Sequence, residues 1–162
     1  MGSQSTPAVT RLAVFLASFG YVGYFPVAPG TAGSAAGLAL SALLHWTGVP
    51  FLALAVAVVL CAVGVWSGTI AERHYARDDP GQVVMDEVVG MLVTLLFLPF
   101  SWRLAVAGFL VFRVLDVIKP YPASRFDKLA GGLGIMGDDV ASAIYANLLL
   151  RAAVWAVPGW LR

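Results

Sequence analysis

The segment FLALAVAVVLCAVGVWSGTIAERH, residues 51–74, decides the fold class. Residues 51–71 carry no charge, and about 20 apolar residues are enough for an α-helix to cross the ~30 Å hydrocarbon core of a membrane. The whole chain has the same character, because 60% of its 162 residues are hydrophobic and 12% are charged. Soluble domains carry about 25% charged residues. A soluble fold of this size could not cover so much apolar surface, so the sequence predicts an integral membrane protein.

Apolar runs separated by glycine, proline and charged residues predict six helices. We expect them at residues 8–19, 31–46, 51–74, 84–98, 104–118 and 138–157. The alternation of apolar and polar residues that is typical of strands is missing from the sequence. We therefore expect an all-α, polytopic membrane bundle of about five to six helices, forming a single domain over residues 1–162. The first helix is too short to cross the bilayer.

If the last five helices alternate across the membrane, three polar segments share one face: residues 20–33, 77–85 and 119–137. All nine acidic residues lie in or near these segments: Glu72, Asp78, Asp79, Asp86, Glu87, Asp116, Asp127, Asp138 and Asp139. Six of the ten basic residues lie there too, whereas the opposite loops carry little besides Arg103. An excess of Lys and Arg marks the cytoplasmic side. We therefore expect the charged face to be cytoplasmic and to hold a polar site.

Charge and cysteine content limit the function classes. The net charge of +1 does not indicate a nucleic-acid-binding protein, which would be expected to be strongly basic. The single cysteine, Cys61, cannot form an internal disulfide. The acidic residues are not accompanied by clustered His or Cys, so they favour a hard cation bound through oxygen, with Mg²⁺ as the first choice.

Two adjacent acids, Asp86 and Glu87, open an apolar helix in the segment MDEVVG, residues 85–90. One acid in a first turn is explained by the helix dipole. Two acids at the edge of hydrocarbon are costly unless they are paired or bind a cation. We predict that at least one of them is functional, and the sequence leaves open which one.

The segment FRVLDVIKP, residues 112–120, places Arg113 and Asp116 three residues apart and hence on one helical face. An intrahelical ion pair would explain this spacing without any site. Alternatively, Asp116 binds a metal while Arg113 or Lys119 contacts phosphate, since Arg suits bidentate contact and Lys acts as a point charge.

Two glycine-containing segments complete the candidate site. In GGLGIMGDD, residues 131–139, Asp138 alone could be a helix N-cap, but Asp138 and Asp139 together exceed what capping needs. In PGTAGS, residues 29–34, a helix N-terminus could offer free N–H groups to a phosphate, helped by the hydroxyls of Thr31 and Ser34. Close helix packing at small residues explains that segment equally well.

Taken together and in this order, these segments resemble the phosphatidylglycerophosphatase A family. The matching motifs are PGTAGS at 29–34, DEVVG at 86–90, FRVLDVIKP at 112–120, RFD at 125–127 and GGLGIMGDD at 131–139. The resemblance covers most of the chain from residue 20 to about residue 146. In one departure, residues 141–143 read Ala-Ser-Ala where the family often has a small Ala-Gly pair, which changes packing more than chemistry.

The resemblance implies Mg²⁺-dependent hydrolysis of the terminal phosphate monoester of phosphatidylglycerol phosphate, giving phosphatidylglycerol and phosphate. It implies a multi-pass protein of the bacterial inner membrane whose partner is a phospholipid substrate. The expected catalytic residues and metal ligands are Asp86, Glu87, Asp116, Asp138 and Asp139. The expected substrate-binding residues are Thr31, Gly33, Ser34, Arg113, Lys119 and Arg125.

Other functions stay open at this point. A small membrane cation transporter or a non-catalytic metal-binding lipid protein would also gather acids at a membrane face. A phosphatidyltransferase ranks last, because its usual spacing of acidic and glycine residues is missing from the sequence. The sequence is compatible with a homo-oligomer, and it does not choose between direct attack by water and an aspartyl-phosphate intermediate.

Overall fold

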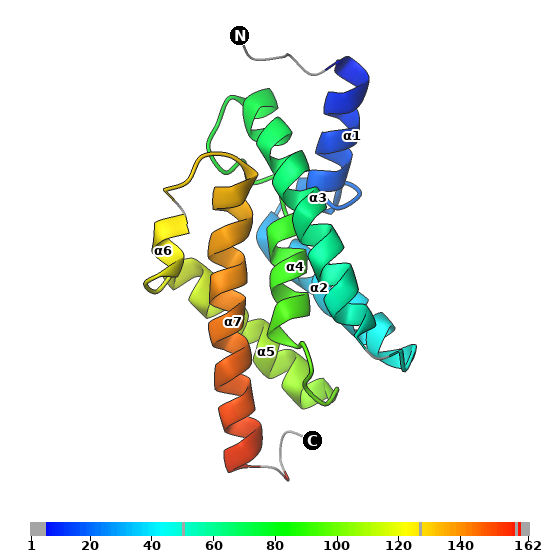
Figure 1. Ribbon diagram of the computed structural model, residues 1–162, viewed down its shortest axis with the longest axis vertical. Coiled ribbons are helices and arrows are strands. Elements are labelled where there is room, and N and C mark those ends of the chain that lie inside the picture. The colour runs from blue at the N-terminus through cyan, green and yellow to red at the C-terminus, as the bar shows by residue number, and fades with distance from the viewer. Residues whose placement is uncertain (1–5, 50, 127, 158, 160–162) are drawn as a thin grey trace.

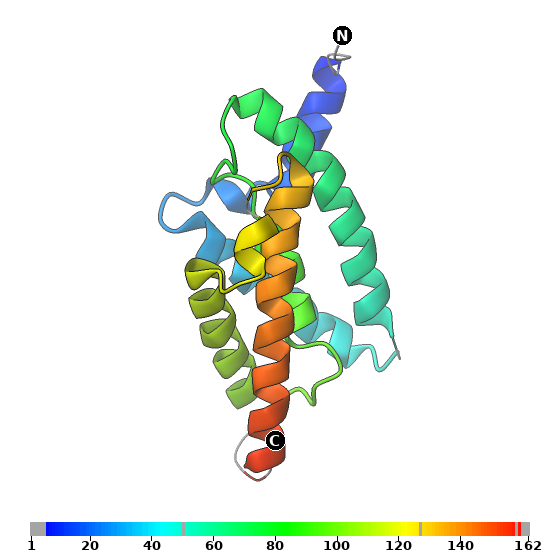
Figure 2. The ribbon, with the colours of Figure 1, turned by 60° about the vertical axis from the view of Figure 1, so that its left-hand side comes forward.

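The computed structural model describes residues 6–49, 51–126, 128–157 and 159, and over these ranges its helices are joined by turns and loops and it has no strand. Its elements in chain order are α1 (Pro7–Ala17), the 3₁₀ helix η1 (Val22–Tyr24), α2 (Pro29–Trp46), α3 (Leu52–Tyr75), α4 (Met85–Thr94), α5 (Trp102–Ile118), α6 (Ala123–Phe126) and α7 (Gly132–Ala156). The helices form an elongated bundle in which α4 is packed against α2, α3, α5 and α7 (Figures 1 and 2). The predicted all-α class is confirmed.

The short helix α4 is the centre of the bundle. All of its ten residues except Glu87 and Val93 are buried. A helix of this length measures about 15 Å, only half of a membrane core. The prediction of a helix over residues 84–98 was wrong at its C-terminal end, because a side chain of α7 bonds to the backbone carbonyl groups of Val93, Thr94 and Leu96.

Glycines allow α2 and α5 to approach α4 closely. A Cβ atom on Gly33 would stand 2.7 Å from the Val84 Cβ, and one on Gly37 would stand 2.7 Å from the Val88 carbonyl oxygen. On α4 itself, a Cβ atom on Gly90 would meet the Phe112 ring at 2.3 Å. Small residues at such crossings let helix backbones pack tightly. The N-terminus of α4 is therefore held beside the start of α2.

The helix α7 begins at Gly132, so the expected start at Asp138 was wrong. A Cβ atom on Gly132 would stand 2.1 Å from the Val65 carbonyl oxygen, and the Gly132 N–H donates to the Thr69 Oγ1 at 2.9 Å. The glycine-rich segment is thus the first part of a helix packed against α3, not a loop. Asp138 and Asp139 lie inside α7 and are buried. The short helix α6 was also not predicted.

Within the described residues, two helices are long and apolar enough to cross a membrane by length and composition. They are α3, with a mean hydropathy of 2.2, and α7, with 1.2. Only 22% of the apolar part of α3 is buried, against 50% for α7. The helices α2, α4 and α5, which were also expected to cross, fall short in length or in hydropathy.

Candidate active site

Four segments that are distant in the sequence meet around one cavity of about 380 Å³. They are the start of α2, the first turn of α4 with the residues that lead into it, the end of α5 and the interior of α7, which lie together in Figure 1. The polar side chains that line the cavity are Asp79, Asp86, Glu87, Arg113, Asp116, Lys119, Asp138 and Asp139. The structure therefore brings together all five predicted acids and two of the predicted basic residues.

Three of these acids form a compact cluster. Asp86, Glu87 and Asp139 each offer a carboxylate oxygen, and these oxygens all lie within 4.8 Å of one another. Within the part of the chain that the structure describes, Asp86 Oδ1, Glu87 Oε2 and Asp139 Oδ2 are buried without a hydrogen-bond partner. Buried carboxylates at this spacing repel one another unless a cation or protons compensate their charge. A cluster of three carboxylates, each with a buried oxygen that lacks a partner, fits a hard divalent cation such as Mg²⁺.

Burial of the two acids in the first turn of α4 disfavours their ionised forms. Burial raises the pKa of Asp86 well above its usual range, and the nearby Glu87 carboxylate adds to the shift. Burial also raises the pKa of Glu87, to about 7, although Arg113 acts in the opposite direction. Without a cation the two carboxyl groups tend to keep protons, so cation binding and proton release are linked at this turn.

Arg113 connects three helices at the site. Its Nη1 donates to the Asp116 Oδ2 at 2.6 Å and to the Ser34 Oγ at 3.5 Å, and it lies 3.7 Å from the Glu87 Oε1. The intrahelical pair with Asp116 therefore exists, but the same nitrogen also reaches α4 and α2. Arg113 fixes the orientation of Glu87 and Asp116 at the cavity wall.

Lys119 separates the roles of the two aspartates on α7. The residue has a positive φ of 47° at the C-terminal cap of α5, and its Nζ lies 2.5 Å from the Asp138 Oδ2. Asp138 also accepts a hydrogen bond from the Asp139 backbone N–H through Oδ1 at 2.9 Å. Asp138 is thus paired with a cationic side chain, whereas Asp139 faces the carboxylate cluster.

Some predicted substrate-binding residues do not line this cavity. Thr31 is exposed on α2, and Gly33 packs against Val84. Ser34 is buried, donates to the Gly30 carbonyl oxygen at 2.9 Å and accepts from Arg113. Arg125 is exposed on α6, 4.9 Å above the Tyr121 ring. Asp127, counted among the acids of the charged face, lies outside the described residues.

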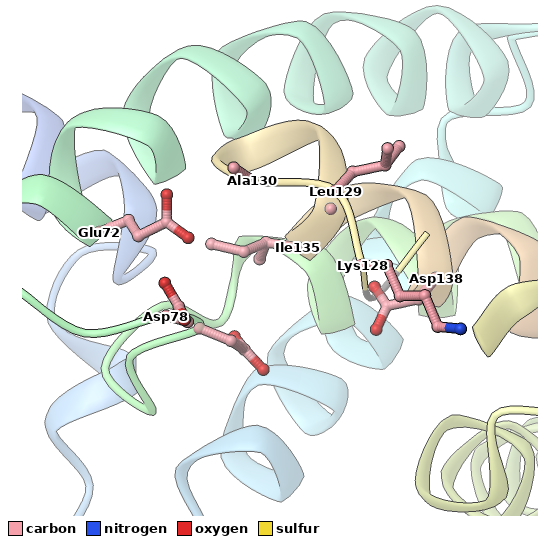
Figure 3. A pocket seen from close by; sticks show the side chains of 9 residues that line it. Glu72, Asp78, Lys128, Leu129, Ala130, Ile135 and Asp138 are labelled. Carbon is pink, nitrogen blue, oxygen red and sulfur yellow. The ribbon is translucent and has the colours of Figure 1, made fainter. Parts of the chain in front are cut away.

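Gly30 and Asp79 also line the cavity, although neither was among the predicted site residues. A Cβ atom on Gly30 would stand 2.2 Å from the Glu87 Oε1, so a side chain there would displace that carboxylate. Asp79 lines the main cavity and also a smaller one of about 170 Å³, whose other acids are Glu72, Asp78 and Asp138 (Figure 3). The glycine at the helix start in PGTAGS, residues 29–34, was an available signal for Gly30, and the position of Asp79 shortly before Asp86 was a weaker one.

Comparison with known proteins identifies the family. The chain matches the family described as Phosphatidylglycerophosphatase A over residues 15–154. It is 39% identical over 134 residues to the Phosphatidylglycerophosphatase A of Escherichia coli K12, covering 78% of this chain and 75% of that protein. It is 36% identical over 140 residues to the protein of the same name from Haemophilus influenzae, covering 83% and 81%.

A third relative has a different name. The chain is 34% identical over 142 residues to a Bacteroides thetaiotaomicron protein named as a candidate phosphatidylinositol-3-phosphatase, covering 83% of this chain and 89% of that protein. No solved structure matches the chain. The match over residues 15–154 and the identity to the two relatives that bear the family's name lead to one conclusion: the chain belongs to the phosphatidylglycerophosphatase A family.

Proposed function

We propose that this protein is a Mg²⁺-dependent lipid phosphatase that hydrolyses the terminal phosphate monoester of phosphatidylglycerol phosphate, giving phosphatidylglycerol and phosphate. One observation carries the proposal. A cluster of three carboxylates with buried oxygens that lack partners in the described chain lies beside Arg113 and Lys119 in a single cavity. The names of the Escherichia coli and Haemophilus influenzae relatives support the substrate.

In this mechanism Asp86, Glu87 and Asp139 would hold the Mg²⁺. When bound there, the ion would supply positive charge that stabilises the phosphoryl oxygens. Asp116 and Asp138, also predicted as metal ligands, lie outside the three-acid cluster, and neither has a buried oxygen without a partner in the described chain. We therefore narrow the proposed ligand set to the three clustered acids.

The remaining residues position the substrate and move the proton. Lys119 provides a positive charge at the cavity wall, and Arg113 keeps Glu87 and Asp116 in place. We assign Asp116 as the base, because it lines the cavity outside the three-acid cluster. The water oxygen forms the new bond to phosphorus, its proton passes to Asp116, and the glycerol oxygen leaves with the electron pair of the broken bond and takes a proton from solvent.

The surroundings of the cavity suit a substrate with lipid tails. Val117 lines the cavity and is 74% exposed, and the next residue, Ile118, is 66% exposed. An apolar surface therefore begins at the rim of a strongly polar cavity. The two long apolar helices and the Lys/Arg bias support a multi-pass protein of the bacterial inner membrane with this cavity on the cytoplasmic face.

The direct test is phosphate release from phosphatidylglycerol phosphate by the purified protein in detergent. We expect release with Mg²⁺ and none with a chelator, and recovery when Mg²⁺ is added back. Phosphatidylinositol 3-phosphate is assayed in parallel, because the Bacteroides relative is named as a phosphatidylinositol-3-phosphatase. Release from that lipid alone would change the substrate, and Mg²⁺ flux into proteoliposomes without any phosphate release would favour a transporter.

Gly30→Ala should lower activity without unfolding the protein. The added methyl would meet the Glu87 Oε1 at 2.2 Å and the Arg113 Nη2 at 3.2 Å, both at the ends of flexible side chains. We expect an activity loss of about 10- to 100-fold, the range for disturbed support of a metal ligand, and a nearly unchanged melting temperature. Gly81→Ala is the control, since a Cβ atom there meets nothing within 4 Å although Gly81 lines the same cavity. Equal losses in both variants would contradict the contact with Glu87.

A further inference from the structure

Two side chains of α7 bind the backbone where α4 ends. The Asn147 Nδ2 has two N–H groups, which share the carbonyl oxygens of Val93 at 3.2 Å, Thr94 at 3.0 Å and Leu96 at 3.0 Å as acceptors. The Arg151 Nη2 donates to the same Leu96 oxygen at 3.0 Å, and its Nε donates to the Asn147 Oδ1 at 2.7 Å. Asn147 and Arg151, called here the α4 cap, thus act as one hydrogen-bonded unit.

The α4 cap meets a physical need at this position. The last four carbonyl groups of any α-helix have no partner within the helix. The helix α4 is surrounded by other helices and would end about halfway through a membrane core. Carbonyl groups away from water must find another donor, and a cationic side chain also interacts favourably with the negative end of the helix dipole. Asn147 is the only asparagine of the chain.

The α4 cap and the carboxylate cluster join the same two helices in matching register. On α4, Asp86 and Thr94 are eight residues apart, and on α7, Asp139 and Asn147 are also eight residues apart. The two helices run in the same direction and lie against each other (Figure 1). Eight residues of α-helix rise about 12 Å. The cluster and the α4 cap are therefore separated by the same distance on both helices. The two sets of contacts can form together only when α4 has one particular axial position relative to α7.

We propose that Asn147 and Arg151 are positioning residues for the cation site. By fixing the end of α4 on α7, the α4 cap holds Asp86 and Glu87 at the height of Asp139, so that the three carboxylates have the spacing that a divalent cation needs. The inference rests on the proposed function, because it assumes that the cluster binds Mg²⁺. Neither residue touches the substrate or the reacting atoms.

The test measures Mg²⁺ binding to the full-length, metal-free protein in detergent by isothermal titration calorimetry, well below the melting temperature of each variant. Asn147→Leu keeps a similar volume and removes both the donors and the acceptor. Arg151→Met keeps an apolar stem and removes the guanidinium, and because Arg151 is exposed this variant should fold. We expect the Mg²⁺ dissociation constant to rise about tenfold in Asn147→Leu, the lower end of the range for residues that orient metal ligands, and to rise less in Arg151→Met.

A neighbouring core residue provides the matched control. Leu150 is buried on α7 next to Arg151 and packs in the core, so Leu150→Ala should lower the melting temperature but leave the Mg²⁺ dissociation constant at the wild-type value. A wild-type dissociation constant in both cap variants would overturn the inference. So would an equal rise in Leu150→Ala, because the effect would then be general loss of stability. Failure of the wild-type protein to bind Mg²⁺ would instead overturn the proposed metal site, and the inference with it.

Discussion

Asp139→Asn should reduce Mg²⁺-dependent phosphate release by about a thousandfold. Charge stabilisation by a bound metal ion is worth several kcal/mol, and each 1.36 kcal/mol of lost transition-state stabilisation lowers the rate tenfold. Asp139 is 3% exposed, and one of its oxygens belongs to the three-carboxylate cluster. An amide keeps the shape of the side chain but replaces one anionic oxygen by an N–H₂ group that cannot bind a cation. The measurement is the initial rate of phosphate release at saturating substrate over a range of Mg²⁺ concentrations.

The melting temperature of the metal-free protein separates this role from a structural one. In the absence of Mg²⁺ the cluster brings three acids together in a buried place, so Asp139→Asn removes a source of repulsion. Without Mg²⁺, we expect the melting temperature of the variant to equal or exceed that of the wild type. When Mg²⁺ is added, the melting temperature of the variant should rise less than that of the wild type. Asp78→Asn serves as the control, since Asp78 is exposed and does not line the main cavity. An Asp139→Asn variant with activity within tenfold of wild type would remove Asp139 from the proposed ligand set.

The sequence was sufficient to predict that the segments around Asp86, Asp116 and Asp139 lie together. Each segment places acids at the end of an apolar run, where a charge is expensive unless it has a function. The prediction that they share one end of the bundle followed from counting crossings. The structure places them around one cavity even though α4 is too short to be a crossing helix.

The boundaries of α4 and α7 could not be predicted because they depend on contacts between distant residues. No local signal ends α4 at Thr94, since the donors that bind its last carbonyl groups come from Asn147 and Arg151. The run from Gly131 to Gly137 has poor intrinsic helix propensity. It is helical from Gly132, whose missing side chain lets the start of α7 pack against the Val65 carbonyl group of α3.

The division of roles within each acidic pair also depends on tertiary structure. Adjacent helical residues point about 100° apart, as follows from 3.6 residues per turn, so Asp138 and Asp139 meet different neighbours, and Asp139 alone of the two belongs to the cluster. The choice is made by Lys119, whose left-handed backbone conformation ends α5 and whose ammonium group pairs with Asp138. On α4, by contrast, both Asp86 and Glu87 reach the cluster, and Arg113 contacts Glu87 from the side.

Arg113→Lys should reduce phosphate release by up to about a hundredfold, the upper end of the range for residues that orient metal ligands. A single guanidinium nitrogen of Arg113 contacts Asp116 and Ser34 and lies near Glu87, so three helices are held at one point. A lysine keeps the positive charge, but its single ammonium lacks the planar fork of the guanidinium and binds as a point charge. If charge alone mattered, Arg113→Lys would keep most of the activity and Arg113→Met would not.

If Arg113 orients Glu87, its substitution should also change the affinity of the protein for Mg²⁺. Because Glu87 is both a partner of Arg113 and a member of the carboxylate cluster, Arg113→Lys should weaken Mg²⁺ binding as well as lower the maximal rate. A residue that only contacted phosphate would change the rate and the Michaelis constant but not the affinity of the metal-free protein for Mg²⁺. Arg103→Lys, outside the cavity and next to Trp102 at the start of α5, is the control and should match wild type in both measurements. Unchanged Mg²⁺ affinity in Arg113→Lys, with a reduced rate, would assign Arg113 to the phosphate and leave the orientation of Glu87 to other contacts.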